Sequence, residues 1–137
     1  MKVFNAVVAV GALLATGSAA LADGDAAKGK SVFNQCKACH ALDKAVVGPP
    51  LGGVVGRKAG SVAGYSYSSL MKEAGEAGLV WNDQELVEYL KNPTEYLKGY
   101  LTSKGKTGTG ASKMVFMLPN ETQRQNVVAY LNEQKAP

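Results

Sequence analysis

The sequence contains few residues that bind metals, with two cysteines and a single histidine among its 137 residues. All three lie between Cys36 and His40. Structural zinc sites need four thiolate or imidazole ligands, so this set excludes such a site within one chain. The single histidine also excludes coordination of one metal ion by two histidines of the same chain.

The sequence also lacks a strong excess of charge of either sign. Its formal net charge is +4, and one unit less without Lys2. This balance is too mild to indicate a nucleic-acid-binding protein, and no nucleic-acid-binding motif accompanies it. It is consistent with an acidic protein partner.

Uninterrupted apolar runs long enough to cross a membrane are missing as well. Lys2 precedes a largely apolar run from Val3 to Ala15, and Ala20-Leu-Ala22 has the A-x-A form of a signal cleavage site. Polar residues interrupt the roughly 20 apolar residues that a spanning helix needs. We therefore predict that residues 1–22 are a cleaved signal peptide and that residues 23–137 form one exported domain without stable membrane insertion.

The most informative motif present is Cys36-Lys-Ala-Cys39-His40, because C-x-x-C-H is the attachment site of a covalent c-type haem. Each thiol can add to one vinyl group of the porphyrin, and the adjacent imidazole can then bind iron. A dithiol oxidoreductase is the alternative reading of C-x-x-C, but it would sit in a βαβ setting, whereas the flanks here are helical. We predict one haem c, attached through Cys36 and Cys39 with His40 as an iron ligand. Because such attachment occurs outside the bacterial inner membrane, we expect a periplasmic protein.

Short helices and long loops are predicted for the rest of the chain, an all-α class. Asp25 is a candidate N-cap for a first helix that buries Val32 and Phe33, and Gly29 would let this helix approach another backbone closely. A capping box at 122–125 predicts the start of the last helix, which we expect to cross the first. Shorter helices are expected over 68–77 and from 82 or 83 to 92, and loops from 40 to 67 would wrap around the haem.

The second axial iron ligand could be a methionine or a lysine, or the position could be empty. Met71 lies in a predicted helix, where core packing is its expected role. Met114 and Met117 follow a glycine-rich segment and precede the last helix, so both could reach the second haem face. The polar segment 102–113, which has no carboxylate, is expected to be flexible.

Several further motifs occur in a fixed order across residues 23–137: Gly48-Pro-Pro-Leu51, Val55-Gly-Arg-Lys-Ala-Gly60, Tyr65-Ser-Tyr67, Trp81, Glu88-Tyr-Leu-Lys-Asn-Pro93, Ser112-Lys-Met-Val-Phe116 and Ala129-Tyr-Leu131. With the haem motif they resemble class I c-type cytochromes, most like the bacterial cytochrome c2 group, which is related to mitochondrial cytochrome c. The resemblance implies the cytochrome c fold, with crossing terminal helices and long loops around one haem.

The resemblance also implies residue roles. Met114 would be the second axial ligand, the carbonyl of Pro49 would accept a hydrogen bond from the His40 ring, and the Tyr89 hydroxyl would lie near the methionine sulfur. Three residues would hydrogen-bond a buried haem propionate, namely Arg57, Tyr67 and Trp81.

Two filled axial positions, with no substrate pocket or catalytic base in view, predict a one-electron carrier and not an enzyme. We expect the exposed haem edge to be ringed by docking residues that attract acidic partners, with Phe116 beside the lysines: Lys37, Lys44, Lys104, Lys106 and Lys113. The resemblance implies a monomer that takes electrons from a cytochrome bc1 complex and passes them to a photosynthetic reaction centre or a cytochrome oxidase. The alternative is a haem peroxidase or small-ligand-binding haem protein with a labile Met114.

Overall fold

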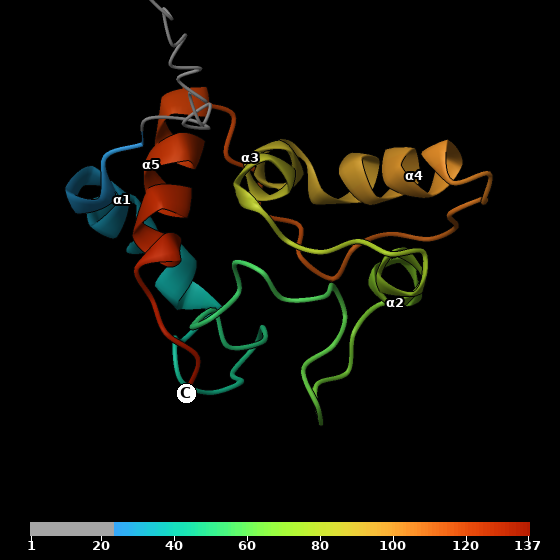
Figure 1. Cartoon of the computed structure of the whole chain (residues 1–137), viewed down its shortest axis with the longest axis horizontal. Coiled ribbons are helices and arrows are strands. Elements are labelled where there is room, and N and C mark those ends of the chain that lie inside the picture. The colour runs from blue at the N-terminus through green and yellow to red at the C-terminus, as the bar shows by residue number, and fades with distance from the viewer. Residues whose placement is uncertain (1–23) are drawn as a thin grey trace, which may run out of the picture.

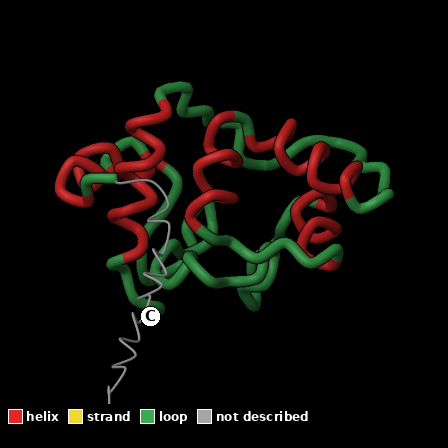
Figure 2. Tube along the Cα trace, turned by 45° about the horizontal axis from the view of Figure 1, so that its top comes forward, coloured by secondary structure: helices red, strands yellow, loops and turns green. Residues whose placement is uncertain are grey.

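The computed structural model describes residues 24–137, so the predicted signal peptide lies outside the described residues. The elements in this part of the chain are α1 (Ala26–Phe33), the 3₁₀ helix η1 (Cys36–Ala38), α2 (Ser69–Glu76), α3 (Asp83–Lys91), α4 (Pro93–Ser103) and α5 (Glu121–Asn132). Figure 2 shows helices joined by loops, and the only β pairing described is one isolated bridge between Lys58 and Val80. The prediction of an all-α fold is confirmed. Within residues 24–137, every helix is too short or too polar to span a bilayer.

The helix starts follow the N-capping residues of the sequence. The Asp25 carboxylate accepts from the amide of Lys28 at 3.0 Å, as predicted for α1. The capping box predicted at 122–125 is wrong, because Asn120 caps α5 and accepts from the amide of Gln123 at 3.0 Å. Asn is at least as good an N-cap as Thr, so the helix gains its cap two residues earlier.

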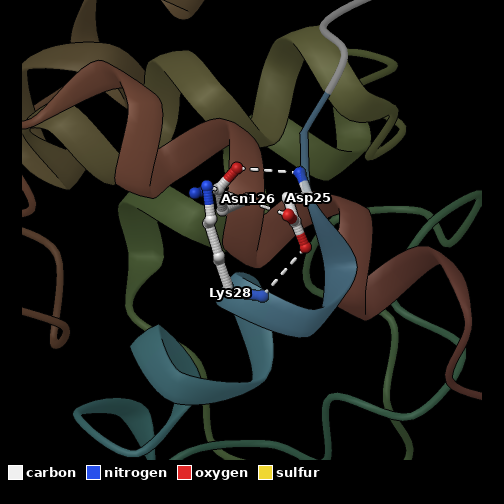
Figure 3. A network of polar contacts seen from close by, with 3 residues as sticks. All are labelled: Asp25, Lys28 and Asn126. Carbon is white, nitrogen blue, oxygen red and sulfur yellow. Dashed lines mark hydrogen bonds and ion pairs between the residues drawn. The ribbon is translucent and has the colours of Figure 1, made fainter.

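The crossing of the first and last helices is confirmed (Figure 1). A Cβ on Gly29 would lie 1.8 Å from the carbonyl oxygen of Asn126, so only glycine permits this approach. The Asn126 side chain also accepts from the amide of Asp25 at 2.8 Å (Figure 3). One residue of α5 therefore fixes both the start of α1 and the distance between the two helices.

The middle helices carry the remaining core. α3 buries Leu86, Tyr89 and Leu90, which lie at i, i+3 and i+4 on one face of the helix. Asn92 ends α3 and caps α4, whose first residue is Pro93. In Figure 1 the orange segment after α4 runs back below α4 and α3 before it rises to α5.

The predicted flexible segment 102–113 begins differently from the prediction. Its first two residues continue α4 to Ser103. Further along, Gly108 is half-buried, and a Cβ there would come within 2.8 Å of Leu70 and 2.9 Å of Leu101. A glycine-rich polar sequence signals freedom of the backbone, but here the absent side chains let the loop pack against α2 and α4.

Candidate haem-binding site

A largely apolar cavity of about 400 Å³ lies among η1, the loops that follow it, α2, α3, α5 and the segment after α4. Its volume falls within the range of cofactor and ligand sites in proteins. Apolar walls come from buried residues on two helices, Leu86 and Leu90 on α3 and Val127 and Leu131 on α5. The donors that reach this cavity decide what group it can hold.

The two thiols and the imidazole of the C-x-x-C-H motif line the cavity together. The amides of Cys39 and His40 both donate to the carbonyl of Cys36, at 3.1 and 2.9 Å, so one tight turn sets the three side chains. Burial raises the pKa of the Cys36 thiol to about 11, so it is protonated at neutral pH in the folded chain.

The His40 ring is held by the loop that follows it. Nδ1 lies 2.8 Å from the carbonyl oxygen of Pro49, which fixes this nitrogen as the donor and leaves Nε2 free for a metal. A Cβ on Gly48 would lie 2.3 Å from Cε1, so the backbone at this glycine covers the ring. Burial lowers the pKa of His40, and the hydrogen bond to Pro49 partly opposes this effect. The lowered pKa favours the neutral form of the ring, which is the form that ligates iron.

Met114 lines the same cavity from the segment after α4. The Tyr89 hydroxyl donates to its sulfur at 3.6 Å, and burial raises the pKa of this phenol to about 12, so the donor proton stays in place. The amide of Met114 donates to the Ser112 hydroxyl at 3.1 Å, and the amide of Ser112 donates to the Thr94 hydroxyl on α4 at 3.0 Å.

The other two methionines of the described chain lie in different surroundings. Met71 on α2 is half-buried, packs on the core as predicted, and also lines the cavity. Met117 is 54% exposed and is not among the lining residues. Met114 is thus the lining methionine whose sulfur has a hydrogen-bond donor.

The three residues expected at a propionate all line the cavity. Arg57 is half-buried, which lowers its pKa, and within residues 24–137 no carboxylate forms an ion pair with it. The Tyr67 oxygen accepts from the amide of Val62 at 3.1 Å, which leaves its own proton free to donate. Trp81 is buried against the Tyr89 ring, with centroids 4.8 Å apart. These unpaired donors fit an anionic group in the cavity, because a buried carboxylate needs such partners.

The candidate docking residues are not gathered at one place. Lys113 and Phe116 line the cavity, and Lys113 donates to the Ser66 carbonyl at 2.6 Å. Lys37 lies on η1 between lining residues, and Lys44 precedes lining Val47 in the loop. Lys104 instead lies just after the end of α4, with its ammonium 5.3 Å from the Tyr100 ring centroid, and Lys106 lies two residues further along. In Figure 1 this end of α4 lies at the far side of the molecule from α1.

Sequence reasoning missed the supporting residues of the site. The Gly48 contact could have been suspected from a glycine before two prolines, a pattern typical of a constrained loop. Thr94 and Ser112 carry no signal, because a threonine in the first turn of a helix and a serine in a loop are ordinary. The cavity itself has the features of a covalent haem site: two thiols, an imidazole, a thioether and unpaired donors.

Comparisons with known proteins point the same way. The Cytochrome c family model matches residues 26–135. A cytochrome c2 of Rhodopseudomonas palustris is 56% identical over 109 residues, covering 78% of this chain and 96% of the relative. Cytochrome c2 iso-1 of Rhodospirillum centenum is 49% identical over 114 residues, covering 80% and 95%. The solved structure of ferricytochrome c2 from Rhodopseudomonas palustris matches with a TM-score of 0.80 and 54% identity, covering 81% of this chain and 99% of that one.

Proposed function

The chain belongs to the cytochrome c family, and from that membership we propose that it is a periplasmic one-electron shuttle whose iron is ligated by His40 and Met114. The family membership by itself shows that the chain is a c-type cytochrome, an electron carrier with covalently bound haem c. The ligating residues, the cellular compartment and the redox partners are what we propose beyond that membership.

The observation that carries the proposal is that one cavity gathers the thiols of Cys36 and Cys39, the imidazole of His40 and the sulfur of Met114. When bound, haem c supplies an iron that gains or loses one electron. The Pro49 carbonyl orients the imidazole, and the Tyr89 hydroxyl orients the thioether. A thioether opposite an imidazole favours the reduced iron relative to a second imidazole, so we propose a relatively high reduction potential.

The surroundings of Met114 also bear on the alternative of a peroxidase or small-ligand-binding protein. Such a protein needs a sixth position that opens readily. Here the sulfur accepts from buried Tyr89, and the backbone amide is tied through the Ser112 hydroxyl. These contacts support a closed sixth position and therefore an electron carrier.

We further propose that residues 1–22 direct export and are removed, and that the mature protein is a monomer. The donor would be a cytochrome bc1 complex and the acceptor a photosynthetic reaction centre or a cytochrome oxidase. Exposed Val47 and Val115 line the cavity; exposed Lys44 lies three residues before Val47, and exposed Lys113 lies two residues before Val115. An apolar centre with basic neighbours suits brief docking to an acidic surface.

The docking proposal is tested by electron-transfer rates from a purified bc1 complex. We expect the second-order rate to fall as ionic strength rises, because salt screens the lysines. Lys44→Glu should slow the reaction at low salt, whereas Lys30→Glu on α1, with the same change in net charge, should have little effect. Equal effects of the two variants, or a rate that does not depend on salt, would reject docking at this face.

A further inference from the structure

Arg124 on α5 is a buried cation that the electron-transfer site does not use. Only 4% of it is exposed. Its Nη1 donates to the carbonyls of Leu118 and Pro119, at 2.9 and 2.7 Å. Its Nε is buried without a hydrogen-bond partner, and within residues 24–137 no carboxylate forms an ion pair with it.

This placement is costly for a residue that only fills space. Burying a guanidinium without an anionic partner carries a desolvation penalty, and an apolar side chain of similar volume often serves better. The position also lies near the N-terminus of α5, where the helix dipole disfavours a positive charge. What Arg124 gains in return is the pair of bonds to two consecutive carbonyls.

Those two carbonyls end the segment that carries Met114. At its start the segment is tied to α4 through Ser112 and Thr94. In its middle, Val115 is 83% and Met117 54% exposed, whereas Met114 and Phe116 pack against the core. At its end, the amide of Leu118 donates to the carbonyl of Leu90 at 2.8 Å, and the two carbonyls accept from Arg124.

We propose that Arg124 is a positioning residue that fixes the end of segment 112–119 and thereby holds the Met114 sulfur at the iron. The inference rests on the proposed function, in which Met114 is the axial ligand. An external ligand can replace the sulfur only if this segment moves away. Arg124 therefore adds to the free energy that this displacement requires, while contacting neither the iron nor the haem ligands.

The test uses the ferric holoprotein titrated with imidazole, which competes for the methionine position. Arg124→Met fills the space without donors and should raise the affinity for imidazole about tenfold or more, because two charge-assisted bonds are lost. Arg124→Lys should stay within about twofold of the wild type: both native bonds come from one nitrogen, and an ammonium group has three donors on one atom. Arg124→Gln provides a second variant with weakened bonds should the methionine variant fail to fold.

Val128→Ala on the same helix is the matched control. Val128 is 2% exposed and does not line the cavity, so its truncation lowers global stability without touching segment 112–119. We expect it to leave imidazole affinity unchanged. The proposal is overturned if Arg124→Met and Arg124→Gln bind imidazole like the wild type, or if Val128→Ala raises the affinity as much as they do at equal loss of stability.

A separate variant distinguishes failure of the proposed function from failure of this inference. If Met114 is the ligand, Met114→Ala abolishes the weak far-red sulfur-to-iron band of the ferric protein and binds imidazole more tightly than any Arg124 variant. If Met114→Ala leaves both the band and the imidazole affinity as in the wild type, the ligand assignment is wrong, and the role of Arg124 is refuted with it.

Discussion

The hydrogen bond from Tyr89 to Met114 should raise the reduction potential, and Tyr89→Phe tests this. The Tyr89 hydroxyl is 3.6 Å from the sulfur and its side chain is 6% exposed, so the bond lies away from solvent. A donor at the sulfur withdraws electron density and makes the thioether a weaker ligand for ferric iron. Removing the hydroxyl should therefore stabilise the oxidised state and lower the potential.

The size of this shift follows from the strength of the bond. A bond to a neutral sulfur contributes about 0.5–1 kcal/mol. For one electron, 59 mV corresponds to a tenfold change in the equilibrium constant, so we expect a decrease of about 20–40 mV. The measurement is an equilibrium redox titration of the purified holoprotein at pH 7 followed by visible absorption.

Tyr96→Phe is the control for this measurement. Tyr96 belongs to the same aromatic cluster, with its ring centroid 5.9 Å from that of Tyr89, but its hydroxyl donates to Glu85 and not to the sulfur. We expect its potential to stay within about 10 mV of the wild type, since no ligand contact changes. If the Tyr89→Phe potential is equal to or above that of the wild type, or if both variants decrease equally, the hydrogen bond to the Met114 sulfur does not raise the potential.

Three further predictions follow from the same geometry. Gly48→Ala should lower the free energy of unfolding by about 1–3 kcal/mol, because the new Cβ would lie 2.3 Å from the His40 ring; denaturant unfolding of the holoprotein measures this, and an unchanged midpoint would contradict it. The double variant with Cys36 and Cys39 changed to Ala should lack fixed tertiary structure by near-ultraviolet circular dichroism, and a sharp two-state melt would count against a haem that completes the core. Burial raises the pKa of Tyr65, whose neutral hydroxyl donates to the carbonyl of Val47 at 3.0 Å. Because the pKa is higher in the folded state, the contribution of the neutral phenol to stability is complete below pH 10 and is lost as the pH rises through the folded pKa. The stability difference between wild type and Tyr65→Phe should accordingly be constant below pH 10 and shrink above it; a difference that grows with pH would be inconsistent with the raised pKa.

Much of the fold could be predicted because its signals are local. The cap at Asp25 and the start of α3 at residue 82 or 83 depend on neighbouring residues, and both were predicted correctly. The start of α5 was misplaced because two possible capping residues, Asn120 and Thr122, lie within three residues, and the capping-box pattern that predicted Thr122 does not consider Asn120. The course of 102–113 depends on packing between Gly108 and Leu70, which is 38 positions away in the sequence.

The candidate site also has a part that could be predicted from the sequence and a part that could not. The proposed haem attachment residues follow from one pentapeptide. The roles expected for Pro49, Tyr89 and Met114 came from the family resemblance, and the hydrogen bonds of Pro49 and Tyr89 agree with them. The residues that hold the segment around Met114 could not be predicted. The bonds of Arg124 to two backbone carbonyls depend on how α5 packs against the preceding loop. Because every residue has a backbone carbonyl, the sequence does not indicate which carbonyls accept these bonds.

The central claim is that Cys36 and Cys39 bind one haem covalently, since every other proposed role depends on that haem. It is tested most directly by mass spectrometry of the protein purified from its natural source, with fragmentation of the peptide that contains residues 36–40. We expect one haem added to that peptide through both cysteines, on a chain that begins at Asp23. A peptide with both thiols free and no added tetrapyrrole would contradict it.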